Sequence, residues 1–133
     1  MRTQVALWLL LVGLACCCAG CLAVAVGAGA AGTVAYMGGD LDTDVSEDID
    51  TLYAASRKAL DDLGLNIIEG KGGKDALSAT IVARDAEDKK VQIKLKSISD
   101  EMTELSIRVA VFGDETKSQL IYNKILENLE TVE

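Results

Sequence analysis

The chain lacks several residue types on which common protein functions depend. Its 133 residues include no histidine and no proline, and only one tryptophan and one phenylalanine. The absence of histidine removes the usual general base near neutral pH and the commonest metal ligand. The net charge of −8 at pH 7 opposes binding to a phosphate backbone, which Lys and Arg would have to neutralise. We therefore expect no nucleic-acid partner, no metal site and no cofactor.

Charge is also absent from the whole N-terminal region. No charged residue occurs from Thr3 to Gly39, whereas charges recur every few positions from there to the C-terminus. Within the uncharged region, the apolar block Val5–Leu14 has the length of a signal-peptide hydrophobic segment. This pattern predicts a signal peptide at residues 1–20, a Gly/Ala-rich apolar tether at 21–39 and a folded domain at 40–133.

All four cysteines lie in the stretch LACCCAGCLAV, and neither Cys nor His follows Cys21. A structural zinc site or a disulfide framework would need partners elsewhere in the chain. The run Cys18-Ala19-Gly20-Cys21 instead resembles the cleavage site of a bacterial lipoprotein, although Cys18 replaces the usual branched apolar residue. Cleavage before Cys16 would place Gly13 at that position, which fits less well, so we expect cleavage before Cys21. The resemblance implies a diacylglycerol on the Cys21 thiol and an acyl chain on its new amino group.

Such an anchor would place the protein in the cell envelope, facing the periplasm. Each buried methylene contributes about 0.8 kcal/mol, so two or three acyl chains hold far more firmly than one. The usual sorting rule of Gram-negative lipoproteins favours the outer membrane, because Leu22 rather than Asp follows the cysteine. The alternative is a retained single span in the inner membrane, for which residues 22–39 would extend the apolar run to about 20 residues. Gly and Ala drive insertion only weakly, so lipid anchoring is the preferred interpretation.

The folded region shows one helix, then a run of strands, then a second helix. The segment DLDTDV alternates acidic and apolar residues as a short strand does, and Ser46 is placed to cap the helix that ends at Gly64. LNIIE is a candidate strand, and three further segments alternate with period two: ALSATIVAR, VQIKLKSI and TELSIRVAVF. Gly113 and Asp114 then open the last helix. We predict an α+β two-layer sandwich of order β-α-β-β-β-β-α, in which both helices cover one face of an antiparallel sheet of four or five strands.

The opposite face of this sheet is predicted to be polar and locally basic. It would carry Arg84, Lys94, Lys96 and Arg108. One explanation is an anionic partner, such as an envelope protein, a cell-wall polymer or lipid headgroups. The other is internal neutralisation, in which the acidic side chains of DLDTDV pair with these cations across neighbouring strands.

The full pattern resembles a family of small bacterial lipoproteins known as domain of unknown function 3568. The resemblance rests on the GC pair with its Gly/Ala tract, on LYAASRKALDDLGL, on KVQIKLKSI and on TELSIRVAVFGDE. It implies the lipid anchor and the fold, and it brings no catalytic residues.

The sequence also predicts no enzymatic activity. DLDTD lacks the glycine and the final acidic residue that a calcium loop requires, and GKGGK lacks the spacing of a phosphate-binding loop. Without histidine or a recognisable nucleophile, only a carboxylate-based enzyme would remain. We therefore expect a structural or interaction module.

Overall fold

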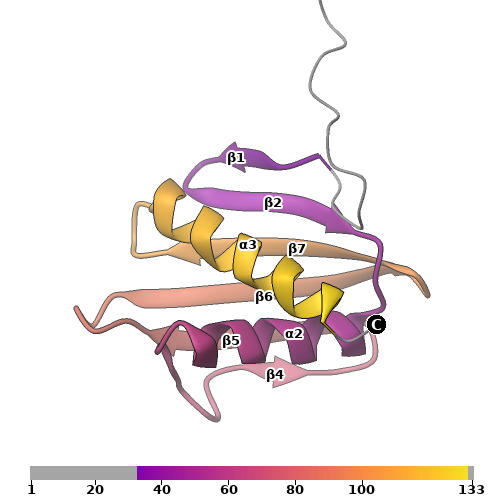
Figure 1. Cartoon of the computed structure of the whole chain (residues 1–133), viewed down its shortest axis with the longest axis horizontal. Helices are drawn as coiled ribbons and strands as arrows, with labels where there is room; N and C mark the ends of the chain where they lie inside the picture. The colour runs from indigo at the N-terminus through magenta and orange to yellow at the C-terminus, as the bar shows by residue number, and fades with distance from the viewer. Residues whose placement is uncertain (1–32, 132–133) are drawn as a thin grey trace, which may run out of the picture.

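The structure of the protein is a computed structural model that describes residues 33–131. The chain forms seven strands and two helices in this region (Figure 1). In chain order they are β1 (Ala35–Met37), β2 (Asp40–Val45), α2 (Ile49–Asp62), β3 (Asn66–Ile67), β4 (Gly73–Lys74), β5 (Ser78–Arg84), β6 (Lys90–Ser99), β7 (Met102–Val109) and α3 (Glu115–Glu130).

The strands form a single antiparallel sheet in the order β1-β2-β7-β6-β5-β3, and β4 also pairs with β5. Both helices cross the same face of this sheet (Figure 1). The predicted α+β two-layer sandwich is therefore confirmed. The expected four or five strands become seven, because β1 and β4 are additional. Each is only two or three residues long, which is too short for an alternating pattern to be visible in the sequence.

The core lies between the sheet and the helices. Strands β2, β5, β6 and β7 each send alternate side chains inward, and rows of residues from neighbouring strands meet on that face. The central row contains Ile93 and Ile107, both 0% exposed. The helices cover these rows with Leu52 and Leu60 of α2 and with Ile125 of α3, so one apolar layer joins all the main elements.

Helix α2 begins two residues later than the sequence indicates. Its N-cap is Asp48 rather than Ser46: the Asp48 Oδ1 atom accepts hydrogen bonds from the backbone N–H groups of Asp50 and Thr51, each at 2.9 Å. The hydroxyl of Thr51 donates to the other carboxylate oxygen at 2.6 Å. These bonds, led by the one from the Thr51 hydroxyl, lower the pKa of Asp48. The expected end is confirmed, since Gly64 follows the C-cap with a φ of +69°.

The folded domain starts earlier than residue 40. Strand β1 lies within the range 21–39 that the sequence predicts as a tether, and it pairs with β2 in the register Tyr36 opposite Leu41. Within residues 33–131, no helix combines the length and the apolar character needed to cross a bilayer.

Candidate functional site

The candidate interaction face is the side of the sheet that the helices leave uncovered. The structure brings all four predicted cations to this side: Arg84 on β5, Lys94 and Lys96 on β6, and Arg108 on β7. The predicted lipidation site, Cys21, lies outside the described residues. The four cations have different surroundings, and these decide which of the two explanations applies to each.

Arg108 is neutralised within the protein. It lies directly opposite Asp40 in the β2–β7 register, and its Nη2 donates to the Asp40 Oδ2 at 2.9 Å, while its Nε donates to Oδ1. Nη2 also donates to the backbone oxygen of Gly38 at 3.0 Å. The hydrogen bonds and charge of Asp40 raise the pKa of Arg108. The two-pronged geometry is typical of an arginine that holds a carboxylate in place, which fits the internal explanation.

Arg84 also finds its partner inside the domain. Its Nη1 lies 3.0 Å from the carboxylate of Asp88 and donates to the backbone oxygen of the same residue at 2.8 Å. Asp88 is in the turn between β5 and β6 and has a positive φ of 63°. Arg84 therefore holds the turn at Asp88, and its positive charge is paired with the Asp88 carboxylate.

Lys94 and Lys96 are different. Both are exposed, and neither forms an ion pair within 4.0 Å with any residue of the described range. In the sheet register Lys94 lies beside Ser106 and Thr80, and Lys96 beside Glu104 and Ser78. With Asp42, Glu104 and Ser106 they border a shallow hollow of about 250 Å³. Pairing with an acidic side chain of DLDTDV thus applies to Arg108; Arg84 is paired with Asp88 instead, and the two lysines have no ion pair within the described residues.

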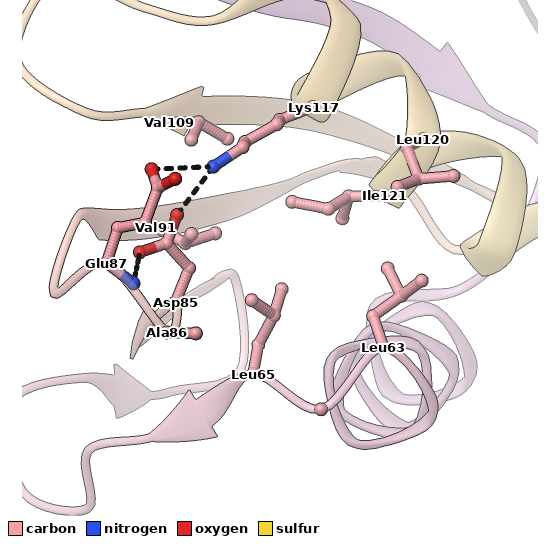
Figure 2. A pocket seen from close by; sticks show the side chains of 11 residues that line it. Leu63, Leu65, Asp85, Ala86, Glu87, Val91, Val109, Lys117, Leu120 and Ile121 are labelled. Carbon is pink, nitrogen blue, oxygen red and sulfur yellow. Dashed lines mark hydrogen bonds and ion pairs between the residues drawn. The ribbon is translucent and has the colours of Figure 1, made fainter.

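A second candidate site is a half-open apolar cavity that the sequence did not reveal. Its volume is about 290 Å³, near the lower end of the range for small-molecule pockets. Figure 2 shows apolar side chains converging on it from the end of α2, from α3 and from the sheet. They are Leu63, Leu65, Ala86, Val91, Val109, Leu120 and Ile121.

The cavity could not be predicted from the sequence, because the residues that form its walls come from segments far apart in the chain. Leu63 and Leu65 flank Gly64 at the end of one helix, whereas Leu120 and Ile121 belong to the other. One signal was present in the sequence: Leu120 precedes the apolar stripe of the last helix and is an additional large apolar residue there. In the structure its side chain is 56% exposed and forms part of the cavity wall.

Charged residues border one side of the cavity (Figure 2). The ammonium of Lys117 donates to the Asp85 Oδ2 at 2.8 Å and lies 3.4 Å from the Glu87 carboxylate. The other Asp85 oxygen accepts from the backbone N–H groups of Glu87 and Lys89, each at 2.9 Å. Asp85 is thereby held by a cation and two backbone donors, while only 9% of its side chain is exposed.

These contacts keep the three groups in their charged forms. The hydrogen bond from Lys117 lowers the pKa of Asp85, and the hydrogen bond from Lys89 with the charge of Lys117 lowers that of Glu87. The Asp85 hydrogen bond raises the pKa of Lys117. A general acid needs a raised carboxyl pKa and a nucleophilic lysine a lowered amine pKa. The pKa shifts of Asp85, Glu87 and Lys117 are in the opposite directions.

Comparison with family models gives one match of nearly full length. The model described as "Protein of unknown function (DUF3568)" matches residues 4–128. The matched range includes the apolar N-terminal region and almost all of α3. The search of curated proteins found no match.

Proposed function

The chain belongs to the DUF3568 family of proteins of unknown function, and from this premise we propose that it is a lipid-anchored bacterial cell-envelope protein whose domain is an interaction module. The anchor is Cys21, and the interaction surface is the uncovered sheet face around Lys94 and Lys96. The family supplies neither role. The support comes from the sequence for the anchor and from the side-chain surroundings for the surface.

The anchor proposal is supported by the order of features along the chain. A ten-residue apolar block precedes the Cys18–Cys21 run, and an uncharged tract then leads directly into β1. An acylated Cys21 would leave a short tether between the membrane and the first strand. A retained apolar span that carries the same domain is the alternative, and it differs in keeping residues 1–20.

One observation carries the interaction proposal: Lys94 and Lys96 are exposed and unpaired within the described residues, while the neighbouring arginines are satisfied internally. A lysine on an open sheet face offers a mobile ammonium that binds carboxylate or phosphate without a fixed geometry. The partner would be an anionic component of the envelope, either an acidic protein surface or a cell-wall polymer. Because such contacts are screened by salt, the association should weaken as ionic strength rises.

The double variant Lys94→Glu/Lys96→Glu tests the interaction. We expect it to lose the partner in envelope crosslinking while its stability falls by less than about 1 kcal/mol: neither lysine has an ion pair to lose, and only position 96, opposite Glu104, gains a like-charge neighbour across the strands. The matched control compares Lys94→Glu with Lys71→Glu, because Lys71 is also exposed and has no ion pair within the described residues but lies in the β3–β4 connection. Loss of stability without loss of crosslinking would contradict the proposal.

Labelling with palmitate tests the anchor independently. We expect the parent protein and a Cys16→Ser variant to incorporate the label, and a Cys21→Ser variant to lose it. Equal labelling of the Cys21→Ser variant would show that the acylated cysteine is a different one. Absence of label from all three proteins would favour the retained span.

The apolar cavity favours a second candidate function, which is binding of a small apolar ligand. Its walls are mostly hydrocarbon, and the ions at its border are already paired with one another. A ligand with an aliphatic or aromatic body and an uncharged polar end would match this lining. Substitution of Leu120 by Lys would place a charge at the wall and should abolish uptake of such a ligand, measured by displacement of an apolar fluorescent dye.

A further inference from the structure

Three large apolar side chains project from one end of the sheet. Phe112 is 93% exposed, Val111 is 78% exposed and Met37 is 72% exposed. We refer to these three residues as the apolar tip. Phe112 is the only phenylalanine of the chain, and almost all of its apolar ring is in contact with solvent. Large exposed apolar groups that occur together mark contact surfaces.

The backbone around the apolar tip is held in unusual conformations. Ala110 has a positive φ of 62°, which is rare for a residue with a side chain. Its N–H nevertheless donates to the backbone oxygen of Lys90 at 2.8 Å, so this conformation is fixed by the sheet. Strained residues that the surrounding structure maintains occur preferentially at binding sites.

Close backbone packing joins the two turns that carry the apolar tip. A Cβ atom added to Gly39, in the β1–β2 turn, would lie 2.5 Å from the backbone oxygen of Phe112. A Cβ atom added to Gly113 would lie 2.6 Å from the Tyr36 hydroxyl and would also overlap Gly39. Only glycine fits at both positions. The β7–α3 loop therefore rests on the β1–β2 turn, and the Phe112 side chain is presented outward.

We propose that the apolar tip inserts into the surface of the membrane to which Cys21 is anchored; this inference rests on the proposed lipid anchor. Met37 ends the strand that directly continues the tether, so the tip and the anchor belong to connected segments. The 12 residues that follow Cys21, up to Thr33, span at most about 40 Å when extended, which allows the tip to return to the bilayer. Phenylalanine is among the residues that settle at the boundary of headgroups and acyl chains.

Electrostatics would contribute little to this contact. Asp40 near the tip is neutralised by Arg108, Asp114 caps α3, and Glu115 beside it is exposed. With a net charge of −8, the protein has no overall attraction to anionic lipids. Insertion of the tip should therefore depend on apolar contact and remain when salt is added, unlike the association proposed for Lys94 and Lys96.

A tryptophan reporter tests the insertion. The one natural tryptophan, Trp8, is replaced by Phe, and Phe112→Trp is introduced into the full chain. The protein is extracted from membranes and reconstituted into phosphatidylcholine vesicles with or without brominated acyl chains. We expect the emission of this variant to be blue-shifted and strongly quenched by the brominated lipid, with no change at high salt. Leu77→Trp is the matched control, because Leu77 is 68% exposed but precedes β5 near the opposite edge of the sheet.

Each other outcome overturns the inference. Equal quenching of both tryptophans would show that the apolar tip does not orient the domain. Shielding of Phe112→Trp from acrylamide without quenching by brominated lipid would show that a protein, or a second copy of this chain, covers it. The mass of the same sample separates the two proposals: acylated protein with an unquenched reporter overturns the tip alone, whereas protein without acyl chains overturns the anchor.

Discussion

Removal of the Asp48 carboxylate should destabilise the domain, whereas removal of the Ser46 hydroxyl should not. The Asp48 side chain accepts hydrogen bonds from two backbone N–H groups at the start of α2 and from the Thr51 hydroxyl. In the Asp48→Ala variant these donors lose their partner. The loss of an N-cap of this kind costs about 1 kcal/mol, with a range of about 0.5–2 kcal/mol.

The corresponding change in melting temperature is measurable. A destabilisation of 1 kcal/mol lowers the melting temperature by roughly 4–8 °C in a domain of about 100 residues. We therefore expect thermal unfolding, followed by circular dichroism, to show a drop of that size for Asp48→Ala. Ser46→Ala should melt within about 2 °C of the parent, because surface substitutions away from such contacts change stability by less than about 0.5 kcal/mol.

The pH dependence provides a second check on the same residue. The folded state lowers the pKa of Asp48 below its unfolded value of about 3.9. Its contribution is therefore fully present above the unfolded pKa and is lost as the pH falls through the folded pKa. The stability difference between the parent and Asp48→Ala should shrink in that acidic range. A larger effect of Ser46→Ala than of Asp48→Ala would refute the assignment of the cap.

Further substitutions test the core, the tight turn and the paired ions. Leu105→Ala should cost about 2–5 kcal/mol in urea unfolding, because Leu105 is 0% exposed. Gly113→Ala should destabilise the domain more than Gly64→Ala. Both substitutions add about 1–2 kcal/mol of strain from the left-handed backbone conformation, but of the two positions only Gly113 also lacks space for a Cβ atom. Equal losses of stability would contradict the close packing at Gly113. Asp85→Asn should flatten the fall in stability at acidic pH, since the folded state lowers the Asp85 pKa and its contribution disappears as the pH drops through that value. If the stability of Asp85→Asn fell with acid as steeply as that of the parent protein, the contact between Asp85 and Lys117 would be contradicted.

The parts of the fold that follow from short-range patterns were predictable. Three long strands alternate apolar and polar residues, and α3 carries Ile121, Tyr122, Ile125 and Leu129 at helical spacing, all of them buried. Gly64 and Asp114 mark helix ends by their own chemistry. The cap of α2 was not predictable in the same way. Ser46 and Asp48 are both good capping residues, and the choice depends on where β2 leaves the sheet.

The remaining errors involve contacts between distant segments. Strands β1 and β4 have no pattern of their own and form because β2 and β5 offer an unpaired edge. Likewise, the sequence pattern does not distinguish the four cations of the sheet face, because each occupies an outward position in an alternating segment. Only the registers show that Arg108 lies opposite Asp40, whereas Lys94 lies opposite serine and threonine. The apolar cavity needs both helices and the sheet in place before it exists.

The anchor at Cys21 is the central claim, and the intact mass of the protein purified from membranes tests it most directly. The proposal predicts a mass that lacks residues 1–20 and includes added acyl chains, and the Cys21→Ser variant should not show this mass. A mass equal to that of all 133 residues without acylation would contradict lipid anchoring and support a retained N-terminal span.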